Sequence, residues 1–211
     1  MLKTIIYDFN GVIAEPNYKK LFTELPFVER FSSLRVLLNL AKNKEMRKAF
    51  NAYKMGKIDM DGLLAETAKY CPHSAYIVPK LLKIYSESVT INTDVIKSIK
   101  ELKKNGVSAI LMSNTTPETE KLIYESGLSE VFDGLIMSAK DQLVKPQPEI
   151  YKYAIKKFNL NPEDTIMIDD KQKNLDVAEN FGIETFMCKN TEETNNLLQD
   201  LIENLYLVNL M

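Results

Sequence analysis

The spacing of hydrophobic residues changes near residue 93 of this 211-residue chain. From about residue 16 to 87, apolar residues recur at the three- and four-residue intervals of helix faces, as in Met46, Phe50 and Tyr53. Beyond residue 93, short apolar runs typical of buried strands alternate with helical stretches. That alternation predicts βαβ units and therefore a parallel sheet.

The predicted strands are short and rich in β-branched residues, as expected for a sheet that is buried on both faces. They cover residues 2–6, 107–112, 135–137, 165–168 and 183–187. We expect an α/β fold in which residues 1–14 and 88–211 form a Rossmann-like parallel sheet of five or more strands. Residues 15–87 are expected to form an inserted all-helical cap, since Glu15-Pro16 cannot continue a strand.

Polar side chains follow the predicted strands where each strand ends. They are Asp8, Ser113, Asn114, Asp169 and Asp170, with Lys145 in a loop after another strand. Each alone is typical of an ordinary turn or helix start. The carboxyl ends of parallel strands share one edge of a sheet, however, so the sequence predicts that these side chains converge on one crevice.

The charges of this crevice favour a divalent cation. Asp8, Asp169 and Asp170 bring three negative charges, and Lys145 offsets one of them. Each remaining like pair would cost roughly 4 kcal/mol at about 4 Å and an effective dielectric near 20. Mg²⁺, which prefers carboxylate and carbonyl oxygens together with phosphate, would neutralise them.

The site therefore predicts phosphoryl transfer. We expect Asp8 to be the nucleophile that accepts the phosphoryl group, with Mg²⁺ and Lys145 offsetting the negative charge. Ser113 and Asn114 would donate hydrogen bonds to phosphate oxygens.

Composition favours a small-molecule partner. The net charge is −2, hydrophobic residues make up 45% and charged residues 27% of the chain, and no basic run exceeds a doublet. This excludes the charge pattern of nucleic-acid or anionic-membrane binding. Cys71 and Cys188 lack the spacing of a zinc site or disulfide framework. With no leader-like or membrane-spanning stretch, we expect a soluble cytoplasmic protein, monomeric or homodimeric, that binds no nucleic acid and no membrane.

Four motifs, in order and together with the helical insertion, resemble the haloacid dehalogenase (HAD) superfamily of hydrolases. They are Asp8-Phe9-Asn10-Gly11-Val12, Ser113-Asn114, Lys145-Pro146-Gln147-Pro148-Glu149-Ile150-Tyr151, and Ile168-Asp169-Asp170 with Asn174 after it. The resemblance covers essentially the whole chain, cap included. The branch that looks nearest contains sugar-phosphate phosphatases and the phosphatase domain of soluble epoxide hydrolases.

The resemblance implies a role for each matching residue. Asp8 matches the nucleophile, Ser113 the phosphate-binding hydroxyl, and Lys145 the lysine that stabilises nucleophile and phosphate. Asp170 matches a direct Mg²⁺ ligand, alongside Asp8 and the backbone carbonyl of Asn10. Asp169 and Asn174 match residues that do not bind the metal themselves but support the residues that do.

Asn10 departs from the family pattern, in which phosphatases carry a second Asp that protonates the leaving group and activates water. An amide cannot transfer that proton, and general acid–base catalysis typically raises the reaction rate by about 10²–10⁴-fold. Three explanations stay open: another acid such as Glu15 or a cap residue, a natural phosphate-binding protein, or an engineered substitution.

The leading hypothesis is a Mg²⁺-dependent phosphatase, a phosphoric monoester hydrolase, that acts on small phosphorylated metabolites such as sugar phosphates. The alternative is a phosphometabolite-binding protein with little or no turnover. A metal-free 2-haloacid dehalogenase is disfavoured, because such a site gains nothing from the adjacent carboxylates Asp169 and Asp170.

Overall fold

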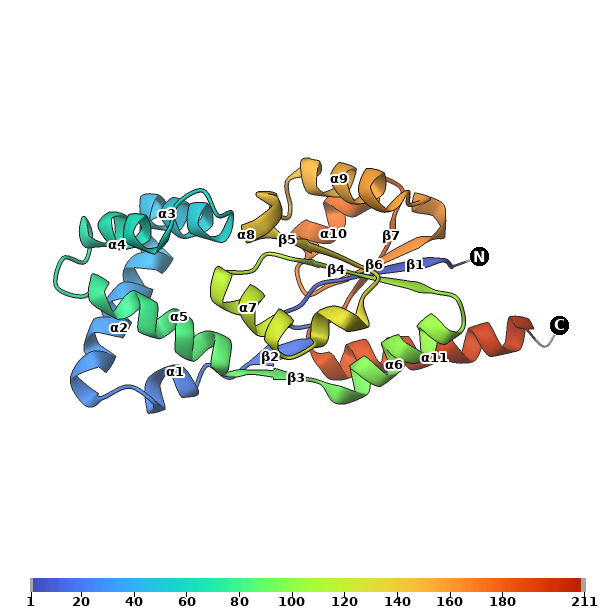
Figure 1. The fold of residues 1–211 in the computed structure, drawn as a ribbon, viewed down its shortest axis with the longest axis horizontal. Helices are drawn as coiled ribbons and strands as arrows, with labels where there is room; N and C mark the ends of the chain where they lie inside the picture. Colours follow the sequence, from blue (N-terminus) through green and yellow to red (C-terminus); the bar gives the residue numbers. More distant parts are fainter. Residues whose placement is uncertain (1, 210–211) are drawn as a thin grey trace.

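The computed structural model describes residues 2–209 and contains a five-stranded parallel sheet covered by helices on both faces (Figure 1). The strand order is β5-β4-β1-β6-β7, and every neighbouring pair is parallel. The strands are β1 (Thr4–Tyr7), β4 (Ser108–Ser113), β5 (Gly134–Met137), β6 (Thr165–Asp169) and β7 (Glu184–Met187). The expected Rossmann-like α/β sheet is confirmed.

Strand β1 lies at the centre because its side chains are apolar on both faces. Ile5 and Tyr7 belong to the hydrophobic cluster on one face, whereas Ile6 belongs to the cluster on the other. Tyr7 is in register with Leu111 of β4 and Ile168 of β6, so three strands end side by side. This register brings residues more than 100 positions apart to one edge.

Helices cover the two faces in pairs. On one face lie α6 (Thr93–Lys104) and α11 (Thr191–Asn209), and on the other lie α9 (Pro148–Phe158) and α10 (Gln172–Glu179) (Figure 1). The remaining helical segments of this part are α7 (Pro117–Glu125), α8 (Ser138–Asp141), and the 3₁₀ turns at Leu128–Val131 and Pro162–Asp164. Across residues 2–209, no helix has both the length and the apolar character needed to cross a membrane.

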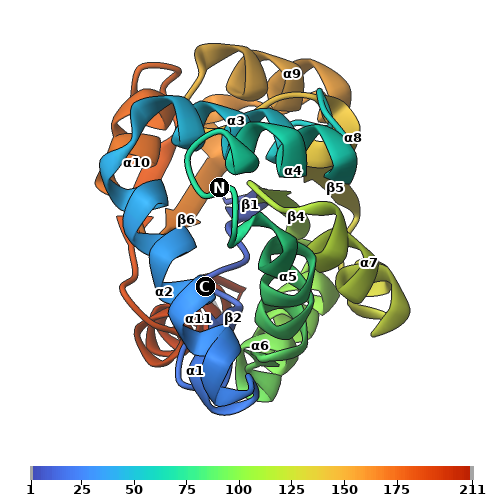
Figure 2. The same ribbon diagram turned by 90° about the vertical axis from the view of Figure 1, so that its left-hand side faces the viewer.

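Helices α1–α5 lie between β2 and β3 in the chain and stand beyond one end of the sheet (Figures 1 and 2). They are α1 (Lys20–Thr23), α2 (Phe27–Lys42), α3 (Lys44–Lys54), α4 (Met60–Ala68) and α5 (Val78–Glu87), with a 3₁₀ turn at Ala75–Ile77. Their buried residues, including Met46, Leu63 and Leu81, form a hydrophobic cluster of their own. The division into a core of residues 1–14 and 88–211 and a cap of 15–87 stays a prediction.

One expectation about the start of the insertion is wrong. Pro16 does not end the extended chain, because β2 (Ala14–Pro16) pairs antiparallel with β3 (Val89–Ile91) in a separate two-stranded sheet. Pro16 is tolerated because it is the last residue of an edge strand, where its missing N–H removes no ladder bond. The two strands are thus the paired connections through which the chain enters and leaves α1–α5.

Further contacts join α3 to the sheet-containing part. The Tyr53 hydroxyl of α3 donates a 2.6 Å hydrogen bond to Glu118 of α7. The Ser138 hydroxyl lies 2.8 Å from the Lys54 carbonyl oxygen and 3.0 Å from that of Thr115. These contacts place the C-terminal end of α3 against the sheet edge where the predicted site residues lie.

Candidate active site

The loop after β1 carries Asp8 and Asn10. The Asp8 amide donates to the Ile168 carbonyl of β6 (2.9 Å), which continues the strand pairing to this residue. The Phe9 carbonyl then accepts hydrogen bonds from Ile13 and Ala14, which closes a tight turn. Gly11 occupies that turn with a φ of +81°, and a Cβ there would lie 2.9 Å from the Asp170 Cβ. Glycine is therefore required for both the backbone conformation and the approach of Asp170.

Lys145 is buried between two carboxylates. Its Nζ lies 2.9 Å from Asp8 Oδ1 and 2.6 Å from Asp169 Oδ2. Burial lowers the pKa of Lys145, but the two carboxylates outweigh it and the net pKa is raised. The lysine therefore stays protonated and holds Asp8 and Asp169 in place.

Asn114 positions the backbone of Lys145. Its Nδ2 donates to the Lys145 carbonyl (2.8 Å) and its Oδ1 accepts from the Lys145 amide (2.9 Å). In the structure the Asn114 carboxamide holds the Lys145 loop against the end of β4, and its predicted phosphate-binding role stays a prediction.

Asp169 is fully buried and bonded through both oxygens. Besides Lys145, it accepts hydrogen bonds from the Lys171 amide (2.9 Å) and from Asn174 Nδ2 (2.8 Å). With both oxygens bonded in this way, Asp169 is placed to orient Lys145 and the β6–α10 loop.

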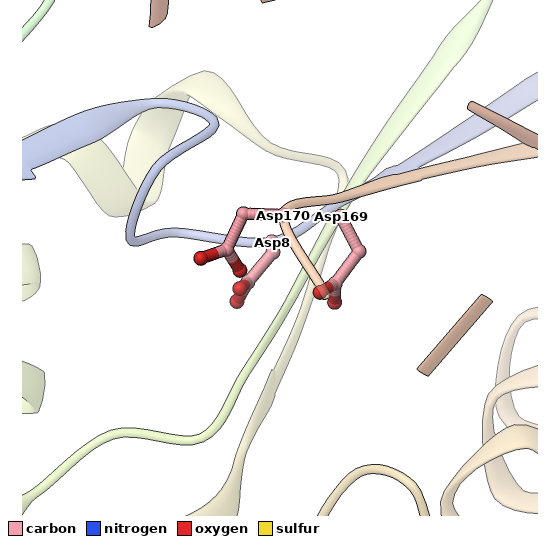
Figure 3. A group of neighbouring side chains, drawn as sticks. All are labelled: Asp8, Asp169 and Asp170. Carbon is pink, nitrogen blue, oxygen red and sulfur yellow. The ribbon is translucent and has the colours of Figure 1, made fainter. Parts of the chain in front are cut away.

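Asp8 and Asp170 direct their carboxylates to the same side, while Asp169 points elsewhere (Figure 3). All three residues offer carboxylate oxygens within 4.8 Å of one another. Asp170 Oδ1 pairs with Lys171 Nζ at 2.8 Å. The expectation that two negative charges remain uncompensated is wrong, because Lys171, next to Asp170 in sequence, neutralises one of them.

The donor set suits a hard divalent cation. Asp8 Oδ2 and Asp170 Oδ2 accept no hydrogen bond within residues 2–209, and both residues line a polar cavity. One net negative charge remains among the three carboxylates and the two lysines. Carboxylate oxygens with a nearby backbone carbonyl, here that of Asn10, are the ligands that Mg²⁺ prefers.

Ser113 is the last residue of β4, and its hydroxyl is fully buried. Within the described chain, Ser113 Oγ has no hydrogen-bond partner. Buried hydroxyls are normally paired, so an unpaired one at the sheet edge indicates a group that a ligand satisfies.

The Asn10 side chain contacts helix α5. Its Oδ1 accepts a 3.3 Å hydrogen bond from the Tyr85 hydroxyl of α5. Burial is the largest of the effects that raise the pKa of Tyr85. Glu15, considered from the sequence as a replacement acid, accepts hydrogen bonds from the amide (3.0 Å) and the hydroxyl (2.9 Å) of Thr191 at the start of α11.

A polar cavity of about 800 Å³ opens above Asp8, Asn10, Asp170 and Lys145. Four further lysines line it, namely Lys54, Lys171, Lys173 and Lys189. Burial, followed by the charges of Lys171 and Lys173, lowers the pKa of Lys54. This excess of cations favours an anionic ligand.

Sequence reasoning missed Lys171, Lys54 and Tyr85. Lys171 could have been found from its position beside the Asp169-Asp170 pair. Lys54 and Tyr85 reach the site only through the packing of α3 and α5 over the sheet edge, which no local pattern reveals.

Comparison with known proteins identifies relatives of this chain. It is 24% identical over 206 residues to rat (Rattus norvegicus) bifunctional epoxide hydrolase 2, matching 90% of this chain but 37% of the relative. The chain thus spans little more than a third of that relative. It is also 24% identical to sesquiterpene phosphatase astK of Aspergillus oryzae, over 86% of this chain and 87% of the relative.

A solved structure shares the fold. A HAD family enzyme from Bacteroides thetaiotaomicron, crystallised with magnesium and inorganic phosphate, superimposes with a TM-score of 0.70 at 19% identity. The match covers 89% of this chain and 94% of the other. Residues 2–182 match the sequence profile of the haloacid dehalogenase-like hydrolases. The chain therefore belongs to the haloacid dehalogenase-like hydrolase family.

Proposed function

We propose that this protein is a Mg²⁺-dependent phosphatase of small phosphorylated molecules that acts through an aspartyl phosphate on Asp8. The observation that carries the proposal is the pairing of Asp8 with buried Lys145 at 2.9 Å, next to the Asp170 carboxylate at the open edge of the sheet. Support also comes from the unpaired Ser113 hydroxyl and from a relative that is a phosphatase.

In the first step, a carboxylate oxygen of Asp8 attacks phosphorus, and the bond between phosphorus and the alcohol oxygen breaks. The electron pair of that bond leaves with the alcohol, which takes a proton from solvent because the Asn10 carboxamide is not an acid. Lys145 holds Asp8 in position and offsets negative charge throughout.

In the second step, water attacks phosphorus, the bond to Asp8 breaks, and inorganic phosphate leaves. Asp8 is thereby regenerated as a carboxylate. Mg²⁺, held by Asp8, Asp170 and the Asn10 carbonyl, would supply positive charge to the phosphate oxygens when bound. Asp169 and Asn174 would support this arrangement through the 2.8 Å hydrogen bond between them.

A phosphate-binding protein with little turnover is the second candidate, and Asn10 is the observation that favours it. Without a positioned acid, an alkoxide leaves slowly, so the protein can bind a phosphorylated molecule and still hydrolyse it very slowly. Dehalogenation is disfavoured because the paired acids Asp169 and Asp170 would serve no metal-free displacement. Cytoplasmic location and a monomeric or dimeric state stay predictions.

The test is to mix the protein with p-nitrophenyl phosphate and Mg²⁺, quench in acid, and locate any bound phosphoryl group by mass spectrometry. The proposal expects a phosphoryl group on Asp8, continuous p-nitrophenolate release, and loss of both in Asp8→Asn. Asp176→Asn, on the exposed surface of α10, is the matched control and should behave as wild type. Phosphate binding with no phosphoryl transfer would establish the second candidate instead.

A further inference from the structure

A second cavity adjoins the polar one and differs from it in chemistry. It has a volume of about 460 Å³, within the range of small-molecule sites. Its hydrocarbon wall comes from three cap helices and includes Val36, Leu40, Phe50, Val78, Leu81 and Leu82. No carboxylate or imidazole of the described residues lines it.

The two cavities share part of their lining. Asn10, Tyr18, Lys54, Tyr85 and Asn114 line both of them. Asn10 lies two residues after Asp8, so a phosphate bound at Asp8 would have its ester oxygen near the boundary between a cationic cavity and an apolar one. The apolar cavity is therefore placed to receive the alcohol portion of the substrate.

The polar side chains that line only the apolar cavity, those of Thr115, Thr116 and Thr119, are already bonded within the protein, with Thr115 Oγ1 donating to Met137 Sδ at 4.0 Å. The Thr116 hydroxyl accepts from the Thr119 amide (3.4 Å) and lies 3.3 Å from the Thr119 hydroxyl. The carboxamide of Asn114 is bonded to the backbone of Lys145. A polyhydroxylated sugar that entered this space would leave hydroxyls unpaired, which is costly, whereas a hydrocarbon would not.

Resting on the proposed phosphatase function, we propose that the substrate is a phosphate monoester of an apolar alcohol, whose hydrocarbon chain or ring occupies the cavity lined by α2, α3 and α5. The phosphate occupies the cationic cavity and the hydrocarbon the apolar one. The sugar phosphates expected from the sequence would place hydroxyls against leucine, valine and phenylalanine side chains.

The test measures binding, which does not depend on turnover. Alkylphosphonates from methyl to octyl are titrated into the protein with Mg²⁺ by calorimetry. Each methylene that enters the cavity is expected to tighten binding by about twofold to fourfold. Leu37→Trp, which fills the cavity from α2, should abolish this dependence on chain length while methylphosphonate binds as before.

Leu38→Trp is the matched control, since Leu38 is the next residue of α2 and its side chain is exposed. It should keep the chain-length dependence. Leu82→Gln, on α5, is a second lining variant, and circular dichroism checks that each variant is folded. Affinity that is flat with chain length, or a gain that survives both lining variants, overturns the assignment.

Turnover of acetyl phosphate separates this inference from the proposed function. Acetyl phosphate turnover without chain-length-dependent binding would keep the phosphatase and reject the apolar alcohol. Chain-length-dependent binding without any phosphoryl transfer would reject the phosphatase and keep the apolar ligand.

Discussion

The Tyr85 hydroxyl of α5 donates a hydrogen bond to Asn10 Oδ1 at 3.3 Å, and this contact ties α5 to the loop that carries Asp8. Asn10 thus has two neighbours of different kinds: Asp8 in its own loop and the Tyr85 side chain of α5. A substitution at position 10 therefore affects both the loop that carries Asp8 and the contact with α5.

Asp170→Ala should weaken Mg²⁺ binding more than about 10-fold. Loss of a residue that only supports a metal ligand already lowers metal affinity by about that factor, and Asp170 is expected to be a ligand itself. The substitution removes one of two free carboxylate oxygens and also leaves Lys171 without its 2.8 Å partner. Calorimetric titration with Mg²⁺ measures the effect. Asp176→Ala, an exposed carboxylate on α10, serves as control. Equal Mg²⁺ affinities in wild type and Asp170→Ala would reject Asp170 as a ligand.

Gly11→Ala should reduce Mg²⁺ affinity as well as stability. The added Cβ would lie 2.9 Å from the Asp170 Cβ, so Asp170 must move. Gly106→Ala is a matched control, because Gly106 has a similar φ of +83° but nothing within 4 Å of the added Cβ. Both variants should lose about 1–2 kcal/mol of unfolding free energy in urea from backbone strain. Only Gly11→Ala should lose metal affinity, and identical metal affinities would refute the packing argument.

Asn114→Ala should uncouple Lys145 from the end of β4. The variant loses two hydrogen bonds to the Lys145 backbone, at 2.8 and 2.9 Å, which together stabilise the fold by about 1–3 kcal/mol. Because Lys145 Nζ then holds Asp8 less firmly, phosphoryl transfer to Asp8 should slow. Urea unfolding and single-turnover phosphorylation measure the two effects. Asn105→Ala, which removes one partly buried hydrogen bond to the Glu101 carbonyl far from the site, should leave phosphorylation unchanged.

Part of this site was predictable from sequence because it depends on local order along the chain. Asp8, Asp169 and Asp170 follow apolar runs, and the parallel pairing of β1 with β6 then brings them together. Lys171 was missed although it is adjacent to Asp170, since sequence alone does not tell which way its side chain turns.

The apolar cavity lined by α2, α3 and α5 could not be predicted from the sequence. Val36, Phe50 and Leu82 have ordinary helical spacing, which predicts a buried face but not whether that face meets another helix or an empty cavity. Pro16 was misjudged because a strand edge tolerates proline, and edges are defined only by tertiary pairing.

Asn10→Asp should raise phosphatase activity most for substrates with poor leaving groups. The two side chains are nearly isosteric, and Tyr85 can donate to either, so the fold should accept the change. Nearby Asp8 and Asp170 will raise the pKa of the new carboxyl, which suits an acid working near neutral pH. An alkoxide needs that proton whereas p-nitrophenolate does not. The gain in kcat/KM at saturating Mg²⁺ should therefore approach about 10²–10⁴-fold for an alkyl phosphate and remain small for p-nitrophenyl phosphate. Asn51→Asp, which adds the same charge elsewhere in the cavity, should show no such difference. If Asn10→Asp changes both substrates equally, the side chain at position 10 does not reach the leaving oxygen or another group already protonates it.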